Sequence, residues 1–153
     1  MSSLEINVES TTPEVKVTLR GQINEDSDLS ALETLSGDSL ILDLQGIDMI
    51  NSCGIREWVE FQNKHFNFPK VIYENCPQVI IEQMNVVAGF IHKNGIIKSF
   101  FAPYFNESTD QEIKILLTPD EVVDGKAPVK KSDDGQELEF DDIEAQYFNF
   151  LKK

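Results

Sequence analysis

Residues 39–61 read SLILDLQGIDMINSCGIREWVEF, and this stretch decides the fold. Leucines alternate with other residues along 40–44, which is typical of a strand that buries one face. After the junction at residues 51–54, apolar residues return at the spacing of an amphipathic helix. The stretch therefore predicts a buried strand that leads directly into a helix starting at Asn51 or Ser52.

The residues at this helix start have a chemistry of their own. A Ser or Asn there can accept a hydrogen bond from the free backbone N–H groups of the first turn. The same N–H groups, with the positive end of the helix dipole, stabilise a phosphate group placed beside them. Asn51 and Ser52 are therefore candidates both for capping the helix and for lying beside a phosphate.

Length and charge limit the classes of function. A chain of 153 residues suits one domain with an appendage, and the net charge is -14. This charge opposes binding to nucleic acid and to anionic membrane surfaces, because both present negative phosphates. No apolar run is long enough to cross a bilayer, and the N-terminal residues lack the pattern of a secretory signal. With Cys53 and Cys76 as the only cysteines, we expect reduced thiols and a cytoplasmic protein.

The remaining apolar periodicity predicts an α/β fold. Further strands are expected at residues 4–8, 15–23, 71–73 and 96–104, and further helices at 29–35 and 78–92. Asp26 or Asp28 is the expected cap of the first of these helices. The resulting order, β-β-α-β-α-β-α-β, predicts a mixed sheet with helices packed against it. Its strands should run mostly parallel after the first pair.

In this context the motif becomes recognisable. The segment LDLQGIDMINSCGIREW resembles the STAS family, the domain of anti-sigma-factor antagonists. That family has an apolar strand, then Asp-Ser-(Ser/Ala/Thr)-Gly, then an amphipathic helix. The match lies in Leu-Asp-Leu at 42–44, Ile50 and Ser-Cys-Gly at 52–54, and the Cys-Pro pair at 76–77 is also similar. The STAS-like mixed sheet would cover residues 4–104.

The resemblance implies a non-enzymatic switch with no catalytic residue and no cofactor. In such antagonists, a partner that is both a serine kinase and an anti-sigma factor phosphorylates the serine after the Asp, and phosphorylation releases that partner. By position the phosphoacceptor is Ser52, while Asn51 stands where the family has Asp. The expected role is bacterial partner switching. The implied partner-binding residues are Asn51, Ser52, Arg56, Glu57 and Glu60.

Three alternatives stay open. In the first, Ser52 is a helix cap and nothing more. In the second, the STAS fold serves as a small-ligand or nucleotide sensor, which stoichiometric ligand release on denaturation would support. In the third, the helix dipole favours a reactive thiolate at Cys53, but neither His65 nor His92 lies in a recognisable pairing motif for a base.

Residues 106–153 are expected to form an acidic extension packed on the STAS-like domain at residues 1–105. The pattern predicts a strand at 112–117 that pairs with 96–104, then a mobile loop at 119–135 and a strand at 137–140. A helix follows, with Asp141 and Glu144 as its capping box. One face of this helix carries Ile143, Tyr147, Phe150 and Leu151. The extension therefore reads as a β-hairpin and a helix.

In arrangement the extension resembles STAS relatives that end in a zinc ribbon with two Cys-x-x-Cys pairs. The corresponding positions, 106–109 and 131–134, contain no cysteine, so no metal is predicted and apolar contacts must hold the hairpin. We expect the tail's aromatic residues to pack back on the sheet, with a self-association surface, and thus a homodimer, as the alternative. These aromatic residues are Phe140, Tyr147, Phe148 and Phe150.

Overall fold

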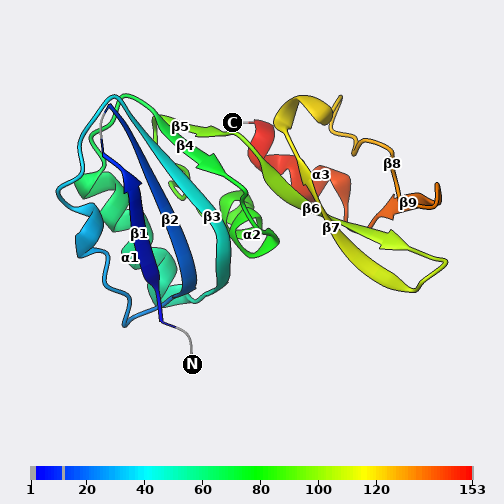
Figure 1. Cartoon of the computed structure of the whole chain (residues 1–153), viewed down its shortest axis with the longest axis horizontal. Coiled ribbons are helices and arrows are strands. Elements are labelled where there is room, and N and C mark those ends of the chain that lie inside the picture. Colours follow the sequence, from blue (N-terminus) through cyan, green and yellow to red (C-terminus); the bar gives the residue numbers. More distant parts are fainter. Residues whose placement is uncertain (1–2, 12, 153) are drawn as a thin grey trace.

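Two β-sheets lie side by side in the computed structural model, which describes residues 3–11 and 13–152 (Figure 1). The first sheet has the strand order β1-β2-β3-β4-β5, formed by Glu5–Ser10, Glu14–Ile23, Ser39–Ile50, Val71–Glu74 and Gly95–Ile97. β1 is antiparallel to β2, and the other neighbours are parallel. This mixed sheet confirms the predicted α/β architecture.

Helices connect the successive parallel strands. They are the 3-10 helix η1 (Ser30–Leu32), α1 (Ser52–His65) and α2 (Gln78–Val86). Because strand order follows chain order, right-handed crossovers place all of them on the same face of the sheet. Alternate side chains of β2 and β3 are buried there, namely Val15, Val17, Leu19, Leu40, Leu42 and Leu44. The buried strand and amphipathic helix predicted for residues 39–61 are therefore confirmed.

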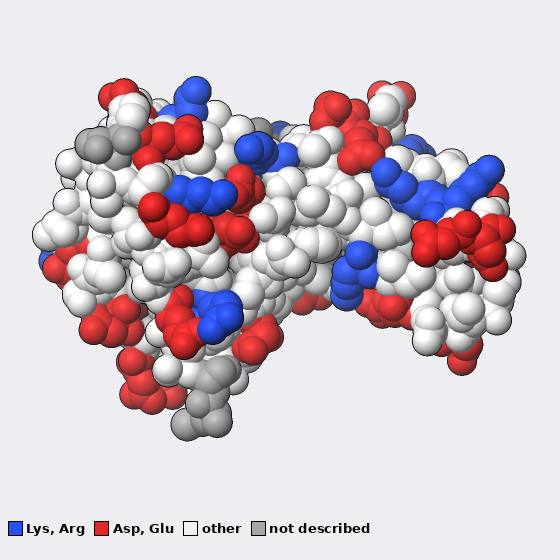
Figure 2. Space-filling model, in the orientation of Figure 1, with Lys and Arg blue, Asp and Glu red and all other residues white. Residues whose placement is uncertain are grey.

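The second sheet is antiparallel and has the strand order β7-β6-β9-β8. Its strands are Gln111–Leu117, Phe100–Asn106, Glu137–Phe140 and Lys130–Lys131. β6 and β7 form the predicted hairpin, paired from Phe100 with Leu117 to Asn106 with Gln111. In the space-filling view the two halves of the molecule form two lobes, with acidic and basic side chains interspersed on both (Figure 2).

The single strand predicted at residues 96–104 is wrong. The chain instead makes β5, bends at Lys98 and Ser99, and enters the second sheet as β6. Cys76 holds this bend, because its N–H donates to the Ser99 carbonyl at 3.2 Å and its own carbonyl accepts from Phe101 N–H at 2.9 Å. The change of sheet therefore precedes the boundary expected at residue 105.

The helix predicted at residues 78–92 is also too long, since α2 ends at Val86. Val87 has extended backbone angles, and Gly89 follows with φ of 81°. This turn lets Phe90 and His92 reach the interior, where they are 1% and 4% exposed. Within the described residues, no helix has both the length and the hydropathy that crossing a bilayer requires.

The helix predicted at 29–35 is a single 3-10 turn. The expected cap at Asp26 or Asp28 is wrong, because Leu29 is the residue that precedes the turn and no side chain caps it. Asp28 instead accepts a hydrogen bond from Ser30 N–H at 3.0 Å through its Oδ1. The expected loop at 119–135 contains the 3-10 helix η2 (Pro119–Glu121) and the strand β8.

The C-terminal segment consists of α3 (Glu144–Tyr147) and the 3-10 helix η3 (Phe148–Lys152). The predicted capping box is wrong, because the Glu144 carboxylate accepts from Ala127 N–H at 2.8 Å and Asp142 accepts from Ile143 N–H at 2.6 Å. The prediction that Ile143 lies on the buried face is also wrong, since this residue is 59% exposed.

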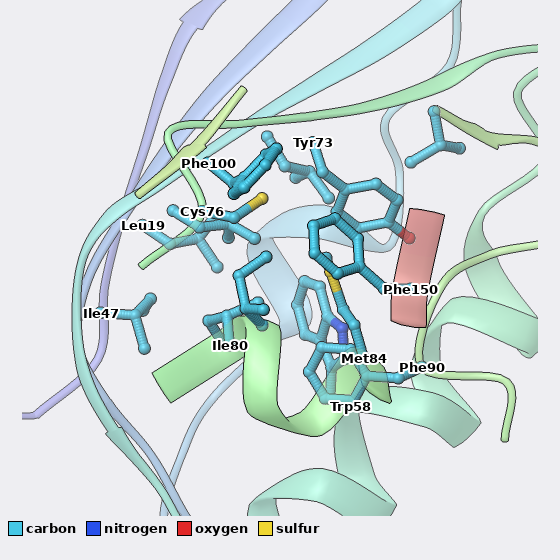
Figure 3. Close-up of a cluster of buried hydrophobic side chains, with 14 of the residues drawn as sticks. Leu19, Ile47, Trp58, Tyr73, Cys76, Ile80, Met84, Phe90, Phe100 and Phe150 are labelled. Atoms are coloured by element: carbon cyan, nitrogen blue, oxygen red, sulfur yellow. The ribbon is translucent and has the colours of Figure 1, made fainter. Parts of the chain in front are cut away.

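The expected packing of the tail's aromatic residues is confirmed. Tyr147, Phe148 and Phe150 are buried, and the rings of Phe100 and Phe150 meet edge to face at 5.0 Å. One continuous cluster of buried side chains joins both sheets, and Figure 3 shows that Phe150 belongs to it. The C-terminal segment therefore packs against α2 within an apolar core that the two sheets share.

Candidate functional site

The junction between β3 and α1 is held close to the end of β2. The two strands are parallel neighbours, and Ile23 at the end of β2 pairs with Ile50 at the end of β3. Gly54, in the first turn of α1, lies against the backbone of Ile23, where a Cβ atom would be 2.2 Å from the carbonyl oxygen. Only glycine fits this approach without displacing backbone.

Asn51 is the cap of α1. Its Oδ1 accepts a hydrogen bond from Gly54 N–H at 2.8 Å, and its own N–H donates to the Ile23 carbonyl at 3.2 Å. Its side-chain Nδ2 donates to Oε2 of Glu25 at 2.8 Å, a bond that lowers the pKa of the Glu25 carboxyl group. The cap is therefore Asn51, and the reading in which Ser52 is the cap is wrong.

Ser52 is the first residue of α1, and its side chain is exposed. Arg56 and Glu60 follow at intervals of four residues, so the three side chains share one face of the helix. Glu57 is exposed on the adjoining face. From Ser52 to Glu60 this surface extends about 12 Å along the helix axis. The structure thus gathers Asn51, Ser52 and Arg56 around the helix start and places Glu60 two turns away.

The loop after β2 also belongs to this surface, and the sequence analysis missed it. The loop carries Glu25 and Asp26, both exposed, and it is fixed by a hydrogen bond from Asn24 N–H to the Ser27 hydroxyl at 2.8 Å. Parallel strands end at the same edge of a sheet, so loops after neighbouring strands lie together. That rule is the available signal, since the patterns at 15–23 and at the leucines of 40–44 both predict strands.

Cys53 is half-buried in the first turn of α1, and the Arg56 guanidinium approaches its sulfur at 4.0 Å. His65 lies at the other end of the helix, with its ring against Phe61 at 4.5 Å. His92 is buried and is bonded through Nε2 to the Phe66 carbonyl. Neither histidine is therefore placed to act as a base for Cys53.

Cys76 is fully buried, and burial raises the pKa of its thiol. Because the thiolate is the reactive form, this environment makes Cys76 a packing residue and the holder of the bend at Ser99.

The segments 106–109 and 131–134, where the resemblance places the cysteine pairs of a zinc ribbon, lie at the turns that close the β6–β7 and β8–β9 hairpins. In one, Asn106 Oδ1 accepts from Ser108 N–H at 3.0 Å, and in the other, Ser132 Oγ accepts from Gln136 N–H at 3.1 Å. Side-chain bonds to backbone therefore stabilise both turns. In the described part of the chain, no group of three or more His, Cys, Asp or Glu side chains is placed to hold a metal ion.

No protein-family model matches the chain, and no curated protein is significantly similar to it. The chain is an α/β protein with a mixed five-stranded sheet and a separate antiparallel four-stranded half-barrel sheet.

Proposed function

We propose that the chain is a non-enzymatic protein-interaction module of the anti-sigma-factor antagonist type, switched by phosphorylation of Ser52. It acts in the cytoplasm in bacterial partner switching. Its partner is an anti-sigma factor with serine kinase activity. The observation that carries the proposal is the exposed Ser52 hydroxyl at the start of α1, between the cap Asn51 and the tightly packed Gly54.

This position suits a phosphoacceptor for a physical reason. The capping bond uses the N–H of Gly54, while the other N–H groups of the first turn and the helix dipole favour a negative group beside Ser52. A phosphate adds roughly two negative charges and strong acceptor oxygens. It would therefore change the surface that the partner meets while remaining compatible with the helix.

Asn51 differs from the Asp of the family motif, and a neighbouring carboxylate stands in for the missing charge. The antagonists that the motif resembles carry an Asp at this position, whereas the Asn51 side chain is neutral. In this chain the Glu25 carboxylate lies 2.8 Å from the Asn51 amide nitrogen and supplies a negative charge at the same junction. Glu25 thus joins Asn51, Ser52, Arg56, Glu57 and Glu60 in the proposed partner-binding surface.

The test is intact-mass measurement with peptide mapping on the full chain purified from its host with its co-purifying proteins. A phosphate on Ser52 together with a kinase-like partner is the expected result. Ser52→Asp should weaken capture of that partner, whereas Ser108→Ala, an exposed serine in the β6–β7 turn, should leave it unchanged. An unmodified Ser52 while the captured kinase is active would reject the phosphorylation switch.

A further inference from the structure

A groove of about 550 Å³ runs between α2 and the C-terminal segment. It lies away from the α1 junction and belongs to no part of the proposed switch. On α2 its wall carries Glu82, Gln83 and Val86, and on the opposite side it carries Asp142, Gln146 and Asn149. These residues come from parts of the chain about 60 positions apart, so only the folded structure forms the groove.

The two walls are fixed to each other at the base of the groove. Asn85 on α2 donates through Nδ2 to the Tyr147 carbonyl at 3.0 Å, and its Oδ1 accepts from Phe150 N–H at 2.7 Å. Tyr147 is buried and donates its hydroxyl proton to the Phe101 carbonyl at 2.5 Å. The groove is therefore preformed, which reduces the entropy cost of binding.

The groove is negatively charged. Glu82 and Asp142 are exposed on opposite walls, and no Lys, Arg or His is found among the described residues that line it. Burial raises the pKa of the Tyr147 hydroxyl, and the charges of Asp142 and Glu82 raise it further. With no basic side chain among the described lining residues, the carboxylates of Glu82 and Asp142 suit a cationic occupant.

The remaining lining residues suit a peptide. The side chains of Gln83, Gln146 and Asn149 each carry an NH₂ donor and a carbonyl acceptor, which match the C=O and N–H groups of an extended main chain. Val86 is 78% exposed and offers an apolar contact on the same wall. Asn149 already donates through Nδ2 to the Asn85 carbonyl at 3.5 Å, so Gln83 and Gln146 are the amides that face the main chain of an occupant.

We propose that this groove binds an extended, Lys- or Arg-rich segment of a partner protein. The amides hold the main chain of the segment, Glu82 and Asp142 pair with its cations, and Val86 contacts an apolar side chain. Because α1 carries the other surface, the module can hold two proteins at once. The inference does not depend on phosphorylation of Ser52.

The test uses the isotope-labelled full chain and a short peptide of alternating Lys and Ala, with a Glu–Ala peptide of equal length as the negative probe. We expect backbone amide signals of Glu82, Val86 and Gln146 to shift only with the basic peptide. Added salt should weaken the binding, because exposed ion pairs are screened. Shifts spread evenly over the surface would contradict a defined groove.

Two variants of equal net charge separate the groove from general attraction to an acidic protein. Glu82→Lys with Asp142→Lys reverses the charge on both walls of the groove, whereas Glu33→Lys with Asp38→Lys makes the same charge change before β3, away from both proposed surfaces. All four side chains are exposed, so both variants should fold. The groove variant should bind the basic peptide about tenfold or more weakly, and the Glu33/Asp38 variant within about twofold of the natural chain. Equal weakening in both variants would overturn the proposal.

Discussion

Gln62 on α1 and Tyr73 on β4 are joined inside the core, where the tyrosine hydroxyl donates a hydrogen bond to Oε1 of the glutamine. The glutamine Nε2 donates to the Phe90 carbonyl at 2.7 Å, and the tyrosine oxygen accepts from His92 N–H at 2.9 Å. A fully buried amide thus ties helix, sheet and the loop after α2 together. Burial also raises the pKa of the Tyr73 hydroxyl, which keeps it a neutral donor.

Gln62→Ala should lower the free energy of unfolding by about 2–4 kcal/mol. The change leaves a cavity and deprives the Phe90 carbonyl and the Tyr73 hydroxyl of partners. Urea denaturation measures the loss, with the neighbouring, exposed Asn63→Ala as the matched control, expected within about 0.5 kcal/mol of the natural chain. Similar losses for both variants would show that the buried network contributes little.

Stability should fall as the pH drops below about 6.5, the ordinary pKa of histidine. Burial lowers the pKa of His92 in the folded state and outweighs the raising effect of the Phe66 carbonyl. Its Nδ1 accepts from Asn94 N–H at 3.1 Å, so protonation there breaks a bond. Because the unfolded chain then binds the proton more readily, acid favours unfolding, by at most about 1.4 kcal/mol per pH unit.

Urea denaturation between neutral and mildly acid pH tests this dependence. His92→Gln keeps an N–H donor toward Phe66. This variant should lose the dependence of the free energy of unfolding on pH between neutral pH and the lower range where carboxyl groups titrate. His65→Gln, a change at a half-buried histidine, serves as the control and should retain it. If the His92→Gln variant keeps the same dependence of unfolding free energy on pH, groups other than His92 cause that dependence.

Gly54→Ala should destabilise the fold by about 2–3 kcal/mol or more, because the new methyl group meets the Ile23 carbonyl and the backbone must shift. Gly125→Ala is the comparison, since nothing lies within 4 Å of its added Cβ and its φ is +73°. In that variant the free energy of unfolding should fall only by the cost of holding Ala in the left-handed conformation, about 1 kcal/mol. Thermal or urea unfolding of both chains gives the difference.

Asn51→Ala should cost about 1 kcal/mol through loss of the cap of α1, whereas Ser52→Ala should change the free energy of unfolding by less than about 0.5 kcal/mol. The reason is that Asn51, and not Ser52, accepts the Gly54 N–H bond. The pair is measured by urea denaturation of the unphosphorylated chain. A larger effect at Ser52 than at Asn51 would contradict the assignment of the cap.

Local pattern was sufficient for much of this fold. The alternating leucines and the helical spacing after residue 54 predicted β3 and α1, and 137–140 predicted β9 with its observed limits. Hydrophobic periodicity works here because each element buries one face against a single core. The helix start was likewise narrowed to Asn51 or Ser52 by the chemistry of capping.

The errors occur where distant residues override local preference. The apolar run at 96–104 reads as one strand, yet Cys76 bonds the Ser99 carbonyl and the Phe101 N–H, and the run is divided between two sheets. The run at 78–92 reads as one helix, yet the shape of the core draws Phe90 and His92 out of helical register. The bonds of Cys76 join residues far apart in the chain, which no local pattern shows.

The sequence by itself determined the α/β class, the strand–helix junction at residues 51–54 and the aromatic packing of the tail, because these depend on spacing along one segment. Only the tertiary structure decided that Glu25 bonds Asn51, and that α2 and the C-terminal segment enclose an acidic groove. Both relationships join residues separated in the chain. They arise from strand pairing and core packing, whose geometry no local pattern encodes.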